Sequence, residues 1–584
     1  MSYLNELCRF YERMTRSADS GMPPDGMTAE NISFALEIDT AGDLIAVADL
    51  RDGKGRGQRL FVPARVPRAS NVAANFLWDN TGYALGVDGK GKEQRTRQTA
   101  AAFRELHQRL LAGCTDTHAV ALLAFLERWQ PAHFAALDVR EALLDSNVVF
   151  RLTGEEGFLH DVPALREIWR AARRADDAGA GRGICLVSGE AGPIARIHPS
   201  VKGVVGAQSS GAALVSFNCP AFESYGKEQS FNAPVSEEAA AAYTSALNYL
   251  LAREHRQMVR IADTSLVFWA DAPVPEESCL GDLFDLTSSD DSPQDRTQVE
   301  RLKAILLALR RGSPLNEADA ALSPDVRFFA LGLAPNAARL SVRFWLSSTL
   351  GDMLRHCGRW YADLALERQF PEKEPEFPPL WLLLDRISTP GRNKIVPPAL
   401  AGQLGRVILS GGRLPESLLG VVLARIHAER RPDYFRAALI KAWLCRNKHE
   451  EKDMTTLNTD EDNIGYRLGR VFALLEKAQR DALGREVNAP LRERYIGSAS
   501  ATPRLVFPML LRLAQHHVTK AKKNQFDGYD VRFSRQVGDI LAGMSDFPAT
   551  LSLEDQGRFM LGYYHQNNAN YRKNDTAQPD AGEE

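Results

Sequence analysis

Two stretches of the N-terminal half alternate between apolar and polar residues, as the strands of a β-hairpin do. In residues 32–50, apolar side chains fall at every second position on either side of an Ala-Gly-Asp turn at residues 41–43. Residues 325–346 repeat this pattern around a turn at Pro335 and Asn336. Because successive side chains of a strand point to opposite faces, the period of two predicts two hairpins.

Other stretches place apolar residues every three or four positions, which is the spacing of an amphipathic helix. In the N-terminal half this pattern predicts helices within residues 93–126, 162–175 and 236–253. Ser236 is followed by two glutamates, which is typical of a helix cap with acids in the first turn. From about residue 398 onward only helical spacing remains. We therefore predict an α+β fold, with an N-terminal mixed α/β region followed by an all-α C-terminal helical bundle.

At 584 residues the chain exceeds a single hydrophobic core, so two or three domains are expected. The bundle is predicted to contain helices at residues 414–428, 432–445, 464–483, 503–523, 528–544 and 554–571. A proline-rich stretch at 370–379 indicates a boundary, and an acidic, serine-rich stretch is typical of a surface loop. The predicted divisions are an N-terminal α/β domain (1–275), the acidic loop or hinge (276–300), a hairpin-containing part of the N-terminal region (301–395), the helical bundle (396–572) and a polar, disordered tail (573–584).

Residues 184–248 concentrate Gly, Ser and Asn in a run that an ordinary core does not need. Ile184–Ser188 and Ala212–Phe217 are apolar runs bounded by turn residues, which predicts two short buried strands. Between and just after these runs stand Lys202, Gly203, Gly206, Gln208, Ser209, Ser210, Gly211 and Asn218. Gly lets backbone N–H groups approach a ligand closely, and Gln, Ser and Asn supply donors and acceptors without fixed charge. We interpret the segment as a recognition loop.

A basic run follows the first predicted hairpin. Its cations are Arg51, Lys54, Arg56, Arg59, Arg65 and Arg68, against a single acid, Asp52, before Asp79. Asn71 and Asn75 come directly after it. Such a run is often a solvated, flexible loop, but the glycines of GKGRG and the two asparagines favour a nucleic-acid surface. Lys and Arg bind phosphates, whereas Asn can address a base edge.

The predicted helix at residues 503–523 is also basic. It contains no carboxylate, and its cations are Arg504, Arg512, Lys520, Lys522 and Lys523. Cations in the last turn of a helix complement the helix dipole, and this alternative explains one or two of the lysines. Five cations without an acid go beyond that explanation.

The overall composition limits which partners and which cellular compartment the sequence predicts for the protein. The net charge of −3 gives no general attraction to nucleic acid, so binding must come from local patches. No apolar run approaches the ~20 residues that a membrane span needs. The seven cysteines show no paired spacing, which argues for a reducing compartment and against a disulfide framework or a zinc site. We predict a cytoplasmic protein with no membrane partner.

The usual motifs of catalysis are missing from the sequence. It contains no phosphate loop, no H-E-x-x-H helix and no G-x-S-x-G turn. His160 and Asp161 form a dipeptide too common to indicate a metal nuclease, and the neighbours His516 and His517 point to different faces of a helix. His198 fits a structural role slightly better than a phosphate contact. We predict that the chain is not an enzyme and binds no cofactor or metal. The alternatives are a metal nuclease and a purely structural scaffold of a ribonucleoprotein.

Several longer stretches resemble one family. They are YLNELCRFYERM at the N-terminus, NFLWDNTGYALG at residues 75–86, the whole of residues 184–248, and further on GLAPNAARLSVRFW, YRLGRVFALLEKAQ, SASATPRLVFPMLLRLAQHH and GRFMLGYYHQ. In this order they are similar to the large subunit of the type I-C CRISPR Cascade surveillance complex. The similarity is weakest in residues 276–321 and 370–414.

The resemblance implies a non-catalytic subunit of an RNA-guided complex. In that family the N-terminal part recognises the protospacer-adjacent motif in duplex DNA and begins strand separation, while the C-terminal bundle helps to hold displaced DNA. The implied partners are CRISPR RNA, target double-stranded DNA and the other Cascade subunits, namely backbone subunits, the crRNA-processing subunit and small subunits. A helicase-nuclease is recruited after target binding.

Guide pairing reads most of the target, so the protein needs to read only a few base pairs and to hold the DNA backbone elsewhere. The predicted motif-reading residues are Asn71, Asn75, Lys202, Gln208, Ser209, Ser210 and Asn218. The predicted phosphate contacts are Lys54, Arg56, Arg59, Arg65, Arg68, Lys227, Arg512, Lys520, Lys522 and Lys523.

Overall fold

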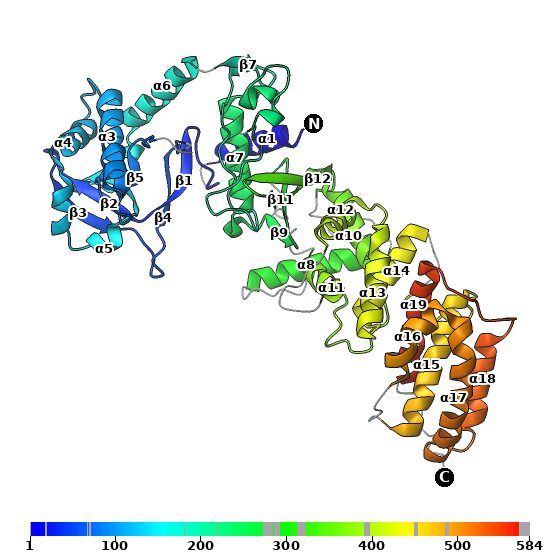
Figure 1. Ribbon diagram of the computed structural model, residues 1–584. Helices are drawn as coiled ribbons and strands as arrows, with labels where there is room; N and C mark the ends of the chain where they lie inside the picture. The colour runs from blue at the N-terminus through cyan, green and yellow to red at the C-terminus, as the bar shows by residue number, and fades with distance from the viewer. Residues whose placement is uncertain are drawn as a thin grey trace, which may run out of the picture. The chain divides into compact units, whose positions relative to one another are not determined.

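The computed structural model describes residues 2–17, 20–66, 68, 72–179, 181–217, 219–272, 284, 293–311, 313, 323–389, 397–448, 454–484 and 490–571. The chain divides into two compact units. Unit 1 comprises residues 1–203, 207–251 and 336–341, and unit 2 comprises 204–206, 252–335 and 342–584. Strands and helices mix in the N-terminal half and helices alone follow, so the predicted α+β fold is confirmed (Figure 1).

The elements of unit 1 are α1 (Tyr3–Thr15), β1 (Met27–Ile32), β2 (Phe34–Ile38), β3 (Leu44–Asp49), β4 (Gln58–Pro63), β5 (Trp78–Asn80), α2 (Thr81–Ala84), α3 (Glu93–Leu110), α4 (Thr117–Arg128), α5 (Arg140–Leu143), β6 (Asn147–Leu152), α6 (Pro163–Gly179), β7 (Arg182–Ile184), β8 (Ala191–Pro193) and α7 (Glu237–Leu251). The elements that follow are β9 (Met258–Ile261), β10 (Thr264–Ala270), α8 (Pro293–Arg310), β11 (Arg327–Asn336), β12 (Arg339–Thr349), α10 (Leu350–Leu364), α11 (Leu380–Ile387), α12 (Pro398–Ser410), α13 (Glu416–Glu429), α14 (Tyr434–Lys448), α15 (Ile464–Leu483), α16 (Leu491–Ala501), α17 (Pro503–Asn524), α18 (Tyr529–Leu541) and α19 (Leu553–Tyr571).

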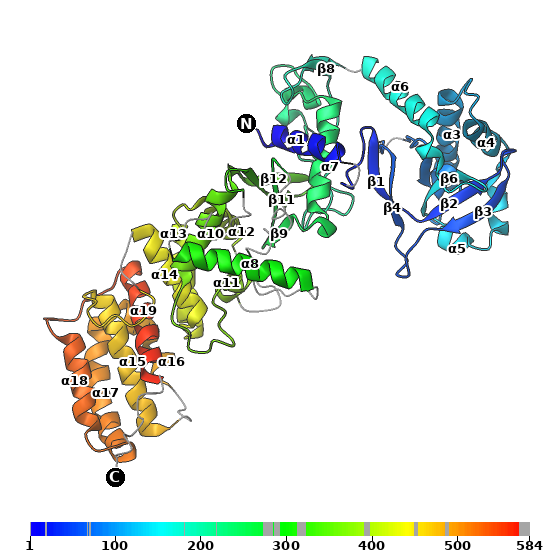
Figure 2. The ribbon, with the colours of Figure 1, turned by 180° about the vertical axis from the view of Figure 1, so that it is seen from behind.

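The first predicted hairpin is confirmed as β2 and β3, which pair antiparallel in a four-stranded sheet of order β3-β2-β6-β5. One face of this sheet presents Phe34, Leu36 and Phe150 to the cluster that contains Phe103 of α3 and Phe125 of α4. The other face packs against the two-stranded ribbon β1–β4. Figures 1 and 2 show the helices and the ribbon on opposite sides of the sheet. Both faces of β2 are therefore buried.

Helix α1 packs along α7 in unit 1, because each presents an apolar stripe to the other. The rings of Phe10 and Tyr249 lie 5.9 Å apart, and the thiol of Cys8 lies 3.5 Å from the Ala239 carbonyl. The predicted cap of α7 is confirmed, since the Ser236 hydroxyl accepts a hydrogen bond from the Ala239 N–H at 3.3 Å. The residues leading into α7 are thereby fixed.

The second predicted hairpin is confirmed as β11 and β12, in a sheet of order β12-β11-β10-β9. Its turn lies further along the chain than predicted. β11 continues through Asn336, and Ala337 adopts a left-handed φ of 53°. The loop predicted at residues 276–300 is wrong for residues 293–300, because α8 begins at Pro293. Most of residues 276–292 and the tail at 573–584 lie outside the described residues.

The predicted C-terminal helices are confirmed as α13, α14, α15, α17, α18 and α19. Two glycines bring α15 and α19 into backbone contact. A Cβ atom on Gly469 would stand 2.0 Å from the carbonyl oxygen of Phe559, and one on Gly562 would stand 2.2 Å from that of Tyr466. Only glycine fits where two helices cross this closely. Gly469 lies in YRLGRVFALLEKAQ and Gly562 in GRFMLGYYHQ, so these two stretches, which resemble the family, form the two packed helices.

One hydrophobic cluster extends through unit 2, from Leu266 of β10 through Trp360 of α10 to Tyr563 of α19. Some of the polar side chains buried in this unit form ion pairs. The Arg446 guanidinium, almost fully buried, binds the Asp363 carboxylate at 2.5 Å. Among the described helices, none is long and apolar enough to cross a membrane.

Candidate nucleic-acid interface

Gln208, Ser209 and Ser210 stand exposed on a closed loop of unit 1, as the recognition-loop hypothesis requires. Val201 and Ala212 exchange two backbone hydrogen bonds of 2.9 Å, which close the loop at its base. Gly211 has a φ of +96°, and a Cβ there would lie 2.8 Å from the Ser200 Cβ. The glycine is therefore required by both the backbone conformation and the space. We call residues 207–211 the Gln208 loop.

The two buried strands predicted around this loop are absent from the described residues. β7 ends at Ile184, and Ile184 and Leu186 are 67% and 66% exposed. The run Ala212–Phe217 forms only isolated bridges, at Ala212 with Val201 and at Ala213 with Arg339. The prediction was wrong because the sequence of a short apolar run does not indicate whether its side chains are buried or exposed. Individual backbone bridges and buried Val201, Val204 and Ala212 hold the segment instead.

Lys202 joins the base of the Gln208 loop to the β1–β4 ribbon. Its ammonium group lies 3.0 Å from the Glu30 carboxylate, and the Arg65 guanidinium approaches the same carboxylate to 3.8 Å. Glu30 is only 8% exposed, whereas the side chains of Lys202 and Arg65 are 39% and 51% exposed. Two partly exposed cations thus share one buried anion, and the group keeps a positive charge.

The basic run after β3 forms a tight turn at residues 52–56. The Asp52 carboxylate accepts hydrogen bonds of 2.9 Å from the backbone N–H groups of Lys54 and Arg56, and these bonds hold its pKa below the usual value. The side chains of Lys54 and Arg56 are exposed. Arg59, also exposed, lies on β4 opposite Asn31. The turn therefore presents cations in a defined conformation rather than on a loose loop.

Arg68 and Asn75 do not belong to an exposed surface, which corrects their predicted roles. Arg68 binds Asp79 through both guanidinium NH groups and lies 3.9 Å over the ring of Tyr83. Asn75 is 1% exposed, and its side-chain oxygen accepts a hydrogen bond from the Val66 N–H at 3.0 Å. Burial raises the pKa of Asp79, against the effect of Arg68. Both side chains therefore stabilise the fold of unit 1 instead of facing a ligand, since buried polar groups need hydrogen-bond partners. Asn71 and Asn218 lie outside the described residues.

Lys227 is exposed at the end of a tight turn that also carries Tyr225. Sequence reasoning singled out Lys227 but missed Tyr225, which is 98% exposed. A tyrosine followed by glycine is a weak signal, because most tyrosines of a folded chain are at least half buried. The left-handed backbone of this turn gives Tyr225 its position.

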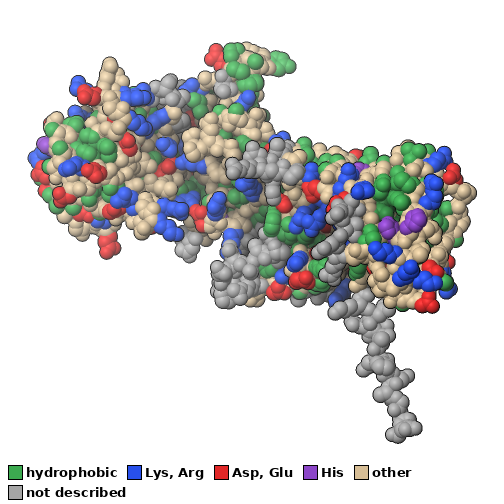
Figure 3. All heavy atoms as spheres, turned by 60° about the horizontal axis from the view of Figure 1, so that its bottom comes forward, with side chains coloured by type: hydrophobic (Ala, Val, Ile, Leu, Met, Phe, Trp, Pro, Cys, Tyr) green, Lys and Arg blue, Asp and Glu red, His purple; other side chains and the backbone are tan. Residues whose placement is uncertain are grey.

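Helix α17 divides into a buried and a basic face. Val506, Phe507, Leu510, Ala514 and Val518 pack inward, at the spacing of an amphipathic helix. The side chains of Arg512, His516, Lys520 and Lys523 are exposed on the outer side. Figure 3 shows Lys and Arg side chains beside His side chains on this part of the molecule. Three of the predicted phosphate contacts, Arg512, Lys520 and Lys523, are thus exposed on one face, and their binding to DNA stays a prediction.

Lys522 differs from its neighbours on α17 and corrects the predicted set. Its ammonium group lies 3.4 Å from the Asp527 carboxylate and 3.2 Å from that of Asp530. These partners raise its pKa. Because two carboxylates match its charge, Lys522 adds little to the positive field of the helix.

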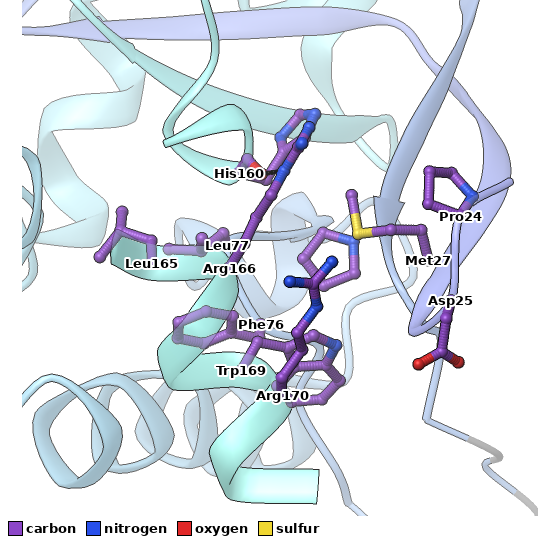
Figure 4. A pocket seen from close by; sticks show the side chains of 11 residues that line it. Pro24, Asp25, Met27, Phe76, Leu77, His160, Leu165, Arg166, Trp169 and Arg170 are labelled. Atoms are coloured by element: carbon purple, nitrogen blue, oxygen red, sulfur yellow. Dashed lines mark hydrogen bonds between the residues drawn. The ribbon is translucent and has the colours of Figure 1, made fainter. Parts of the chain in front are cut away.

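A small cavity of unit 1 lies between α6 and the start of β1 (Figure 4). Its volume of about 20 Å³ holds one water molecule. His160 lines it, is 2% exposed and has an Nδ1 atom without a protein partner, which a water would satisfy. Burial lowers the pKa of His160 to about 4. Within the described ranges, no three His, Cys, Asp or Glu side chains are placed to hold a metal ion.

A family model for CRISPR-associated proteins (Cas_Csd1) matches residues 7–571. The chain belongs to this family. It is thus a large subunit of a CRISPR Cascade complex, as the resemblance implied, and it works with other Cas subunits. The match spans both units, so the Gln208 loop, the basic turn and α17 all lie inside it. No curated protein matches the chain.

Proposed function

We propose that this large subunit reads the protospacer-adjacent motif of duplex DNA with the Gln208 loop. One observation carries the proposal: Gln208, Ser209 and Ser210 are exposed on a loop that a left-handed glycine holds closed. Uncharged donors and acceptors can distinguish base pairs in a groove, whereas contacts of Lys and Arg with phosphates carry no sequence information. A closed loop also loses little conformational entropy on binding.

Cations beside the loop supply the affinity that a short motif cannot. Lys202 and Arg65 surround Glu30 at the base of the loop. Lys54 and Arg56 are held in the turn between β3 and β4 of the same unit. Such groups bind the DNA backbone in any sequence and fix the position of the reader on the duplex. Arg68 and Asn75 are left out, since their side chains are committed inside the unit.

The large subunit also acts in the later steps of target capture. Reading the motif starts the opening of the duplex, and the guide RNA then pairs with one strand and displaces the other. The exposed face of α17, with Arg512, Lys520 and Lys523, supports the displaced strand. The large subunit then helps to recruit a helicase-nuclease, and makes or breaks no covalent bond itself.

Alanine replacement of Gln208, Ser209 and Ser210 tests the reader. Each good bidentate base contact contributes ~1–3 kcal/mol of discrimination. The variant complex should bind motif-flanked and motif-free targets with affinities that differ about tenfold less than in the wild type. Gln98→Ala and Gln108→Ala, on exposed sites of α3, serve as matched controls. An unchanged motif preference in a folded triple variant would remove the Gln208 loop from the reader.

The non-catalytic part of the proposal has its own test. The purified chain is incubated with duplex and single-stranded DNA, with and without Mg²⁺, Mn²⁺ or Zn²⁺. We expect intact DNA at all times. Metal-dependent cleavage that persists through further purification would support the rival class, a metal nuclease.

A further inference from the structure

A second exposed feature of the 184–248 segment is a four-residue turn, Ser224–Lys227, with an aromatic ring at its tip. Tyr225 has a φ of 55° and Gly226 a φ of 67°, so both central residues are left-handed, as in the tight turns of β-hairpins. The Lys227 N–H donates to the Ser224 carbonyl at 3.0 Å. Tyr225 as a whole is 98% exposed, so its ring stands in solvent. We call these residues the Tyr225 turn.

One amide side chain clamps both ends of the turn. Asn232 accepts a hydrogen bond from the Ser224 N–H at 2.8 Å and donates one to the Lys227 carbonyl at 2.8 Å. It also donates to the Gln229 carbonyl at 2.9 Å. The backbone beneath Tyr225 is therefore fixed, although the ring itself makes almost no contact with the chain. This arrangement lowers the entropic cost of binding through the ring.

Tyrosine is the wrong residue for this turn if stability alone matters. The left-handed conformation suits Gly and Asn, whereas a bulky residue there is strained. An exposed aromatic ring also gains nothing from the hydrophobic effect in the free protein. A strained backbone together with a fully exposed ring points to a ligand that covers the ring.

The surroundings of the turn suit nucleic acid. Lys227 is exposed beside Tyr225, and the Arg339 guanidinium lies 4.4 Å over the partly exposed ring of Phe222. Arg339 also bridges through its backbone to Ala213, two residues after the Gln208 loop, so loop and turn share one scaffold within unit 1. Of the nearby acids, Glu223 accepts a hydrogen bond from the Gln229 N–H at 3.2 Å, and Glu228 is exposed.

We propose that Tyr225 is a stacking site for an unpaired base of the target DNA, exposed when the duplex opens beside the motif. This inference rests on the proposed function. Aromatic rings on a fixed backbone stack on bases of any sequence, because every base has a π-face. A base stacked on Tyr225 no longer competes to re-pair, so the ring should speed the opening of the first base pairs rather than select the motif.

The test uses the assembled complex and a target with 2-aminopurine next to the motif, whose fluorescence rises when the base unstacks. Tyr225→Asn is the informative variant, because Asn suits the left-handed turn and removes the ring without loss of stability. We expect it to slow opening about tenfold. Tyr225→Phe keeps the ring and should open the target at the wild-type rate. A target already mismatched at these positions should open equally fast with all three proteins.

Normal opening by Tyr225→Asn would overturn the inference and leave motif reading untouched. Loss of another subunit from the Tyr225→Asn complex would also overturn it, since the turn would then be a protein contact. If the wild-type complex itself showed no motif preference, the proposed function would fail instead. Binding of the purified chain to single-stranded DNA then decides on Tyr225: about tenfold weaker binding by Tyr225→Asn supports stacking, and equal binding refutes it.

Discussion

Neutralising the outer face of α17 should lower the salt dependence of binding to single-stranded DNA. Arg512, Lys520 and Lys523 are exposed on this face, and no carboxylate belongs to the helix. The distance from the first to the last is 11 residues, or about 17 Å along the axis, which suits several consecutive phosphates. The variant carries Arg512→Gln, Lys520→Gln and Lys523→Gln, which keep long polar side chains.

The magnitude follows from counterion release. Each phosphate contact contributes about 0.7 to the slope of log affinity against log salt for single strands, so the triple variant should lose about 2. Over a fourfold rise in salt, the wild type should therefore lose about 20-fold more affinity than the variant. Fluorescence anisotropy of a labelled, mixed-sequence strand measures both slopes with the full chain.

Lys522→Gln is the internal control for this measurement. It removes the same charge from the same helix, but Asp527 and Asp530 already match that charge. Its slope should stay close to that of the wild type. If the triple variant also kept the wild-type slope, the face would meet solvent or another subunit, and its assignment as a strand support would be refuted.

Three further predictions concern the fold. Gly469→Ala should destabilise the chain by ~3 kcal/mol or more, because its Cβ would meet the Phe559 carbonyl oxygen at 2.0 Å. Gly538→Ala, with no atom within 4 Å on α18, should be neutral or stabilising in the same urea titration. His107, whose pKa burial lowers to about 4, is neutral in the fold and charges only on unfolding. His107 should thus contribute its full stability above pH ~6.5 and lose up to ~3 kcal/mol of it as the pH drops to ~4. Burial also lowers the pKa values of His160 and His198 to about 4, so His107→Gln should make the pH dependence of stability shallower without removing it. Arg68→Ala should cost ~3–5 kcal/mol, because the buried Asp79 carboxylate keeps its two backbone hydrogen bonds but loses its opposite charge. Unchanged stability would instead make Arg68 a candidate for DNA binding again.

The elements with strong periodicity were predictable from the sequence. The hairpin at residues 32–50 and the helices from α13 onward each repeat one spacing over many residues, and the Ser236 cap uses a local hydrogen bond. The segment around Ile184 was not predictable in this way. Its short apolar run carries two exposed side chains, and long-range backbone bridges rather than strands hold its loop.

The candidate site shows a similar limit. Lys54 and Arg68 belong to one basic run, but only the fold shows that Arg68 finds Asp79, 11 residues further on. The acids that pair with Lys522 are Asp527 and Asp530, which come after the end of α17. A charge count restricted to the predicted helix therefore misses them. Tyr225 owes its exposure to a left-handed φ, which a sequence pattern rarely indicates outside Gly, Asn and Asp. Exposure and pairing are properties of the fold rather than of residue type.

Site-specific photo-crosslinking tests the central claim most directly. A photoreactive phenylalanine analogue replaces Ser209, which is exposed at the tip of the Gln208 loop. The assembled complex is irradiated on a target labelled in each strand, and the crosslinked nucleotides are mapped. The account predicts crosslinks to the base pairs of the flanking motif, lost when the motif is removed. Crosslinks to another protein subunit alone, or to DNA irrespective of the motif, would contradict it.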